Sequence, residues 1–136
     1  MAQSKPIALD TNCVLRWLLR DNKTQADIVE NHMKAAKARL HVSDMVFAEV
    51  VWVLKSYYEF DDRLIEGFMR KLIENDKINC NRELFGRVLD HINTRPTVSF
   101  IDTCLVFYAE LSDARLLTFD QKLAKKFPRL AQLAGE

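Results

Sequence analysis

Short apolar segments alternate along this chain with longer segments whose apolar residues recur at helical spacing. The short segments cover residues 6–9, 39–42, 77–80 and 114–119, and each contains Ile, Leu or Val. Strands that alternate with helices form βαβ units, and their right-handed crossovers produce a parallel sheet. The alternation therefore predicts a helix-rich α/β fold, a three-layer α/β/α sandwich around a short-stranded central parallel sheet.

Predicted helices fill most of the remaining chain. They cover residues 12–21, 24–38, 43–58, 61–75, 82–93, 101–113 and 120–127. Ser43 is positioned to cap the third of these helices, and Pro96 interrupts the pattern between the fifth and the sixth. Three Gly and three Pro among 136 residues leave little room for linkers. We therefore expect a single domain that spans residues 1–136.

The composition argues against several classes of protein. With 20 basic and 19 acidic residues, the net charge is +1, so any nucleic-acid-binding surface must be local. Cys13, Cys80 and Cys104 are odd in number and form no Cys-x-x-Cys pair, which argues against a disulfide framework or a zinc site and favours a reduced, cytoplasmic setting. The N-terminal segment lacks the apolar core of a secretion signal, and the longest apolar run is about half a membrane span.

Three aspartates stand where a predicted strand or extended segment gives way to a helix. Asp10 follows the first strand, Asp102 opens the helix of residues 101–113, and Asp120 follows the last strand. An aspartate at such a junction is often only a helix N-cap, because its carboxylate accepts hydrogen bonds from the first free N–H groups of the helix. Taken singly, each of the three is explained by capping.

Glu49 is harder to explain by local structure, because it stands in the apolar helical segment VFAEVVWVL. Its neighbours three and four positions away are Met45, Val46, Trp52 and Val53, so its own helix offers no cationic partner. A buried carboxylate must pair with a cation or become protonated. We expect either an ion pair with a distant Arg or Lys, or a bound metal ion.

The predicted topology allows these acids to meet. Ligands of α/β proteins bind where the carboxyl ends of parallel strands reach one edge of the sheet. Asp10, Asp102 and Asp120 can face that edge, and a helix that starts there can carry Glu49 alongside. Four carboxylates without a cation would repel one another, whereas oxygen-only clusters suit Mg²⁺ or Mn²⁺. The sequence thus predicts a metal site formed by the four acids.

The segments LDTN, FAEVVWVL, IDTCLVFYAEL and LLTFDQKL, in this order, resemble the PIN-domain ribonucleases. The similarity covers nearly the whole chain and is greatest to short bacterial toxins of the VapC type, whose beginning is closely matched by DTNCVLRWLLRDNKTQA. The resemblance implies an endoribonuclease that hydrolyses RNA phosphodiester bonds with Mg²⁺ or Mn²⁺, as the toxin of a type II toxin–antitoxin pair. It also implies a homodimer held inactive by a small antitoxin.

Carried over residue by residue, the resemblance assigns both metal binding and catalysis to Asp10, Glu49, Asp102 and Asp120. It places Asn12 and Thr118 at polar positions beside these acids, where they would orient a carboxylate or a water. This chain departs from the family in having Ile101 where an Ala is frequent, and SDARLL where a Gly often precedes the last strand. Neither departure removes a ligand.

Contact with RNA phosphates requires local positive charge. The candidates lie on the first and last predicted helices and are Arg16, Arg20, Lys122, Lys125 and Lys126. For any one of them, an ordinary solvated surface position is the better explanation.

Other classes fit this sequence less well. A receiver-like Mg²⁺-binding domain needs paired acids after its first strand, and an Asp-x-Asp phosphatase needs an acid at position 12, whereas Asp10 stands alone and Asn12 follows it. His32, His41 and His91 lie outside the acidic pattern, which leaves Ser/His or Cys/His catalysis without support. A PIN-like binding module that has lost catalysis stays open as an alternative.

Overall fold

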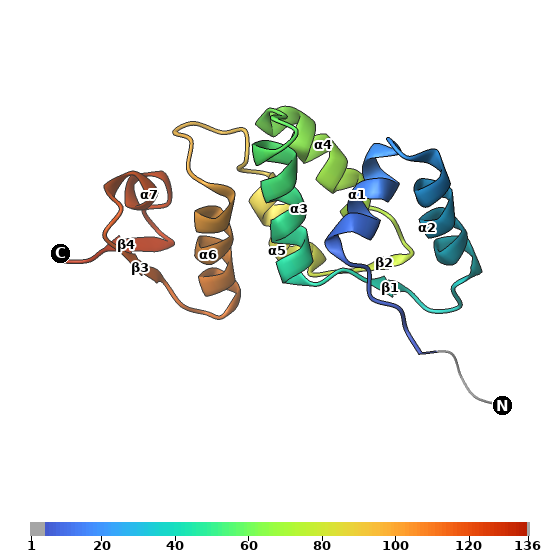
Figure 1. Ribbon diagram of the computed structural model, residues 1–136. Coiled ribbons are helices and arrows are strands. Elements are labelled where there is room, and N and C mark those ends of the chain that lie inside the picture. Colours follow the sequence, from blue (N-terminus) through green and yellow to red (C-terminus); the bar gives the residue numbers. More distant parts are fainter. Residues whose placement is uncertain (1–4, 136) are drawn as a thin grey trace. The chain divides into compact units, whose positions relative to one another are not determined.

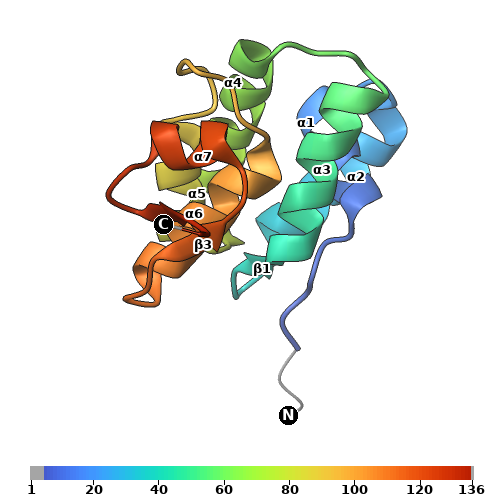
Figure 2. The same cartoon turned by 90° about the vertical axis from the view of Figure 1, so that its left-hand side faces the viewer.

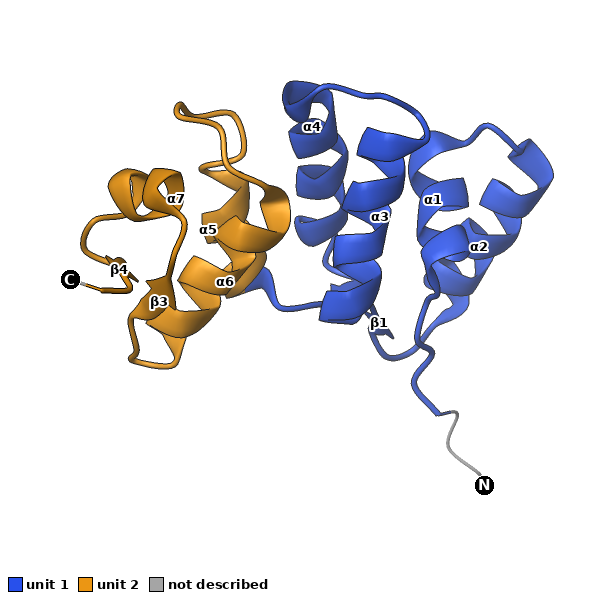
Figure 3. Cartoon of the chain, turned by 60° about the vertical axis from the view of Figure 1, so that its left-hand side comes forward, with its two compact units in different colours: residues 1–82 blue, residues 83–136 orange. Residues whose placement is uncertain are grey.

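The computed structural model describes residues 5–135. The chain divides into two compact units, residues 1–82 and residues 83–136 (Figure 3). Residues 1–4, which belong to the segment predicted to carry no secretion signal, lie outside the described part, as does Glu136. Within the described part, no helix combines the length and the apolar character needed to cross a membrane. The single-domain prediction for residues 1–136 stays a prediction.

Four helices lie entirely within unit 1, and each has a polar N-cap. They are α1 (Thr11–Leu19), α2 (Lys23–Ala35), α3 (Asp44–Ser56) and α4 (Asp62–Ile73). The capping residues have extended backbones, and their side-chain oxygens accept a hydrogen bond from the first turn of the helix; they are Asp10, Asn22, Ser43 and Asp61. Such caps satisfy N–H groups that have no partner inside the helix. Helix α1 packs against both α2 and α3 (Figures 1 and 2).

The strands of unit 1 are very short. Strand β1 (Leu40–His41) pairs in parallel with β2 (Ile78–Asn79), at the centres of two predicted strands. The predicted first strand, residues 6–9, is reduced to a single parallel bridge between Ala8 and His41. Backbone hydrogen bonds of 2.8 Å on both sides of this bridge hold the segment beside β1 and so fix the position from which α1 starts.

The core of unit 1 is formed by the apolar faces of its helices. Helix α3 contributes Phe47, Val50 and Leu54, and α4 contributes Ile65 and Met69, all of them fully buried. These residues recur at spacings of three and four, as expected for one face of an amphipathic helix.

Unit 2 combines helices with a second parallel strand pair. Its elements are α5 (Arg82–Leu89), which begins at the boundary of the units, α6 (Phe100–Leu111), β3 (Leu116–Thr118), α7 (Gln121–Lys126) and β4 (Ala131–Leu133). Strands β3 and β4 pair in parallel, and α7 packs on both (Figure 2). Strand β4 was not predicted, because a strand of only three residues is too short to show an alternating pattern.

Helix α5 ends four residues earlier than the predicted range 82–93, and the tertiary structure of unit 2 explains the end. The ring of His91 lies between Phe107 and Phe127, at centroid distances of 5.0 and 5.3 Å. Lys126 donates hydrogen bonds from Nζ to the carbonyl oxygens of His91 and Thr94, at 3.2 and 3.1 Å. Lys126 of α7 thus satisfies carbonyl oxygens of the turn that follows α5, and the ring contacts of His91 hold that turn in place.

The helix-rich α/β class with short parallel strands is confirmed. The sequence predicted one central sheet, and the structure has one parallel strand pair in each unit. The three-layer arrangement around a single sheet stays a prediction.

Candidate functional site

Asp10 lies at the start of α1, directly after the bridged segment. Its Oδ1 accepts a hydrogen bond of 2.8 Å from the backbone N–H of Cys13, so the carboxylate caps the helix. Burial raises the pKa of the Cys13 thiol, and a hydrogen bond to Asp10 and the negative charge of that carboxylate raise it further. Asp10 is exposed and uses one oxygen in the cap, which is compatible with a ligand at the other.

Glu49 is exposed, so the expectation of a buried carboxylate is wrong. The buried face of α3 carries Phe47, Val50 and Leu54, and Glu49 projects from the opposite face together with Met45. Glu49 lines a hollow of about 490 Å³ that is also lined by Asn12 at the start of α1. The contact between α1 and α3 thus brings one predicted acid and one predicted polar residue to the same space.

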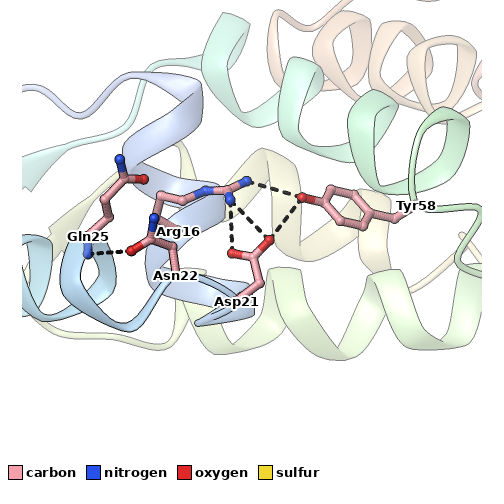
Figure 4. A network of polar contacts seen from close by, with 5 residues as sticks. All are labelled: Arg16, Asp21, Asn22, Gln25 and Tyr58. Carbon is pink, nitrogen blue, oxygen red and sulfur yellow. Dashed lines mark hydrogen bonds and ion pairs between the residues drawn. The ribbon is translucent and has the colours of Figure 1, made fainter.

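A network of polar side chains occupies one side of this hollow (Figure 4). Arg16 donates from Nη1 to both carboxylate oxygens of Asp21, at 2.9 and 3.0 Å, and from Nη2 to the hydroxyl of Tyr58, at 3.1 Å. The Tyr58 hydroxyl lies 3.3 Å from Asp21 Oδ2 and donates to it. The hydrogen bond with Tyr58, followed by the charge of Asp21, raises the pKa of Arg16.

This network supplies no partner for Glu49. Arg16 lines the same hollow, but its guanidinium pairs with Asp21, and Glu49 forms no ion pair with a residue that the structure describes. The sequence offered two explanations for Glu49, an ion pair with Arg or Lys and a bound metal ion, and the described residues do not supply the first.

The other two predicted acids belong to unit 2 and lie at helix starts. Asp102 is half-buried in the first turn of α6, where its backbone N–H donates to Ser99 Oγ at 3.0 Å. Asp120 caps α7, and its Oδ1 accepts from the N–H of Leu123 at 3.1 Å. Thr118 accepts from the N–H of Asp120 at 3.0 Å, so it holds the backbone of that residue.

The structure divides the predicted residues between the two units. Asp10, Asn12 and Glu49 lie on the packed helices α1 and α3 or at their ends, and Asp102 and Asp120 lie at the starts of α6 and α7, which both pack on β3. Within either unit, residues 5–135 contain no group of three or more His, Cys, Asp or Glu side chains that could hold a metal ion. The union of all four acids in one site stays a prediction.

The chemistry of the predicted ligands fits a hard divalent cation. All four are carboxylates, and the polar residues beside them, Asn12 and Thr118, also offer oxygen. Oxygen-only sets select Mg²⁺ and Mn²⁺ over zinc or copper, which favour sulfur and imidazole. The residues present therefore fit the metal that the sequence predicts.

The five cations proposed for RNA contact have different environments. Arg16 pairs with Asp21, and Arg20 pairs with Asp27 at 2.7 Å. Lys126 is bonded to two carbonyl oxygens of unit 2. The remaining two, Lys122 and Lys125, are exposed, and neither forms an ion pair with a described residue.

Sequence reasoning missed Asp21 and Tyr58 as members of the hollow. Asp21 stood at the end of a predicted helix, and its distance of five residues from Arg16 is longer than the usual helical pair spacing. Tyr58 lies 42 residues from Arg16 along the chain, so no local pattern could pair them.

The sequence profile of the PIN domain family matches residues 7–128, which covers both groups of acids. The chain belongs to the PIN domain family. No curated protein matches the chain significantly. PIN domains are nuclease-like, generally depend on metal ions, usually Mg²⁺ or Mn²⁺, and act on RNA. Because the chain belongs to this family, the receiver-like and phosphatase alternatives no longer apply.

Proposed function

We propose that this PIN domain is a metal-dependent endoribonuclease that hydrolyses RNA phosphodiester bonds. The observation that carries the proposal is that all four predicted acids lie within the residues that match the PIN domain family. Asp10, Asp102 and Asp120 each stand in the cap or first turn of a helix, and Glu49 shares a hollow with Asn12. Asp10 and Asp120 each use one carboxylate oxygen in a cap, which leaves the other oxygen available to a ligand.

In this proposal Asp10, Glu49, Asp102 and Asp120 hold Mg²⁺ or Mn²⁺. When bound, the metal supplies charge for the phosphoryl oxygens and lowers the pKa of a bound water. Glu49 accepts the proton of the attacking water, whose oxygen forms a bond to phosphorus while the bond to the leaving oxygen breaks. Solvent supplies the proton for that leaving oxygen. Asn12 orients the attacking water, and Thr118 fixes Asp120 through its backbone.

We further propose that the enzyme is the VapC-type toxin of a type II toxin–antitoxin pair, active as a cytoplasmic homodimer and held inactive by a small antitoxin. The support is the sequence resemblance over nearly the whole chain. Expression of the chain alone should arrest bacterial growth, and co-expression of the small reading frame next to its gene should restore it. Growth that is unaffected by the chain, with nuclease activity present, would contradict the toxin role and leave the nuclease role standing.

Cleavage of a labelled single-stranded RNA tests the nuclease proposal. Asp10→Asn, Glu49→Gln and Asp102→Asn should each lower the cleavage rate by at least the roughly 10- to 100-fold that even outer partners of a metal contribute. EDTA should abolish cleavage, and Mg²⁺ or Mn²⁺ should restore it.

Two matched variants control for changes in charge and capping. Asp61→Asn alters another helix cap, at α4, whose Oδ1 accepts from Leu64 N–H at 2.9 Å, and Glu74→Gln alters an exposed glutamate of unit 1. Both should cleave like the wild type. Cleavage that persists in EDTA, and whose rate neither Asp10→Asn nor Glu49→Gln lowers, would overturn the proposal. Retained RNA binding without any cleavage would favour the inactive PIN-like module.

A further inference from the structure

Positive charge is concentrated at the C-terminal end of the chain. Residues 114–136 contain five basic and two acidic residues, a net charge of +3. Residues 1–113 contain 15 basic and 17 acidic residues, a net charge of −2. The overall charge of +1 therefore hides a basic segment that forms β3, α7 and β4.

This basic segment encloses a hollow of about 500 Å³ between α7, β4 and the start of β3. Two exposed cations, Arg115 and Lys125, and two exposed amides, Gln121 and Gln132, line it. Among residues 5–135, no carboxylate lines it. Neither cation forms an ion pair with a residue that the structure describes, so their charges are not neutralised there.

The guanidinium of Arg115 is oriented at this hollow. It donates from Nη1 to Gln132 Oε1 at 3.5 Å and from Nη2 to the carbonyl oxygen of Pro128 at 3.4 Å. Both bonds are long and therefore weak, so they can be exchanged for stronger ones. An oxyanion would offer Arg115 an opposite charge and shorter, bidentate hydrogen bonds in place of these long bonds to neutral oxygens.

The ligand chemistry that fits this lining is a chain of phosphates. Cations together with amide donors, without a competing carboxylate, suit the anionic oxygens of a nucleic-acid backbone. Gln121 directly follows Asp120, the acid at the N-cap of α7. Lys125 lies about 6 Å further along the helix axis than Gln121, at 1.5 Å per residue. A strand bound along the hollow thus has one end beside a proposed catalytic acid.

We propose that the hollow between β3, α7 and β4 binds the phosphodiester backbone of the RNA substrate away from the cleaved bond, through Arg115 and Lys125. The proposal rests on the proposed ribonuclease function and names the surface that holds its substrate. The sequence already predicted RNA contact for Lys125. The hollow adds Arg115, which no local sequence motif marks as an RNA-binding residue.

Binding of a fluorescein-labelled single-stranded RNA to the full chain, measured by anisotropy in EDTA at several salt concentrations, tests this proposal. For single strands, each phosphate contact contributes about 0.7 to the slope of log Kd against log salt. The double variant Arg115→Gln/Lys125→Gln should lower that slope by about 1.4 and weaken binding about 25-fold at 0.1 M salt. The matched double variant Lys34→Gln/Arg39→Gln removes two exposed cations of unit 1 and should change both quantities much less.

The outcomes separate this inference from the nuclease proposal, because binding in EDTA does not depend on cleavage. Loss of RNA binding in the double variant of the hollow supports the inference even if no RNA is ever cleaved. If both double variants lost RNA binding equally, net charge alone would explain the effect, and the inference about the hollow would be overturned. Unchanged RNA binding with loss of binding to poly-glutamate would assign the hollow to an acidic protein and also overturn it. Thermal unfolding of each variant verifies that it is folded.

Discussion

Removing the hydroxyl of Tyr58 should destabilise the protein, because this group joins α1 to the end of α3. The hydroxyl accepts from Arg16 Nη2 at 3.1 Å and donates to Asp21 Oδ2, which lies 3.3 Å away. Tyr58→Phe keeps the ring and its contacts and removes both hydrogen bonds. It leaves the guanidinium and the carboxylate paired with each other but without their third partner.

The magnitude follows from the charge and exposure of the partners. Hydrogen bonds to charged groups contribute about 1.5–3 kcal/mol when they are shielded from water. Here the Arg16 side chain is 23% exposed and that of Asp21 is 41% exposed, so water replaces part of what is lost. We expect a loss of about 1.5 kcal/mol for the pair of bonds. At about 2.1 cal/mol/K per residue, this lowers the Tm of a chain of 136 residues by about 5 °C.

Differential scanning calorimetry and urea unfolding measure this loss, with Tyr57→Phe as the matched control. Tyr57 is the neighbouring residue, its side chain is 77% exposed, and its hydroxyl forms no hydrogen bond with a described residue. Tyr57→Phe should change stability by less than about 0.5 kcal/mol, as expected for an exposed position. In a double-mutant cycle, Tyr58→Phe and Asp21→Asn should show a coupling of about 0.5 kcal/mol or more. A Tyr58→Phe variant as stable as the wild type, or additive double-mutant effects, would refute this account of the network.

Two further predictions follow from single side chains. Ser99→Ala removes the cap whose Oγ accepts from the N–H of Asp102, so urea unfolding should show a loss of about 1 kcal/mol, and Ser99→Asp should retain most of the stability; equal losses for both substitutions would exclude capping as the cause. Burial raises the pKa of the Cys80 thiol, which the charge of Asp44 raises further and Arg82 partly lowers. Below that raised pKa, the folded state therefore contains less of the reactive thiolate. Alkylation of Cys80 by iodoacetamide at pH 8, followed by mass spectrometry of the Cys80 peptide, should be slower in the folded than in the urea-unfolded chain. Equal alkylation rates would contradict the raised pKa.

Local sequence signals predicted the parts of the structure that are determined locally. Ser43 was expected to cap a helix, and it accepts from the N–H of Val46 at 3.2 Å. The aspartates at positions 10 and 120 were expected at junctions between strand and helix, and both cap the helix that follows. A side chain and a backbone N–H three residues later decide these features, so the printed sequence contains all that is needed.

The environment of Glu49 could not be predicted in the same way. Helix α3 carries large apolar residues on both faces, because Met45 and Trp52 are 81% and 65% exposed while Phe47 is buried. Periodicity cannot identify the inner face of such a helix, and the nearly uniform apolar pattern suggested burial all round. Contacts with other elements, which decide the face, are not encoded within the segment.

Pairing between distant segments was the other limit. Strand β4 is recognised by its hydrogen bonds to β3, and its three residues carry no alternating pattern. The pairing of Arg16 with Tyr58, which follows α3, likewise depends on tertiary packing. Short strands and long-range polar networks are the features for which single-sequence reasoning has least information.

Two of the three glycines of this chain stand where the backbone does not require them, whereas Gly135 has a φ of 96°. Gly67 and Gly86 lie inside helices α4 and α5, and an added Cβ would meet no atom within 4 Å at either position. Arg20, Glu59 and Asp113 instead adopt the left-handed conformation, with φ of 54°, 57° and 57°. Asp113 lies in SDARLL, the segment that leads into β3, and forms a left-handed turn there without a glycine. The chain thus forms these three left-handed turns without glycine, while its two helical glycines leave room for stabilisation, because each is about 1 kcal/mol less favourable in a helix than alanine.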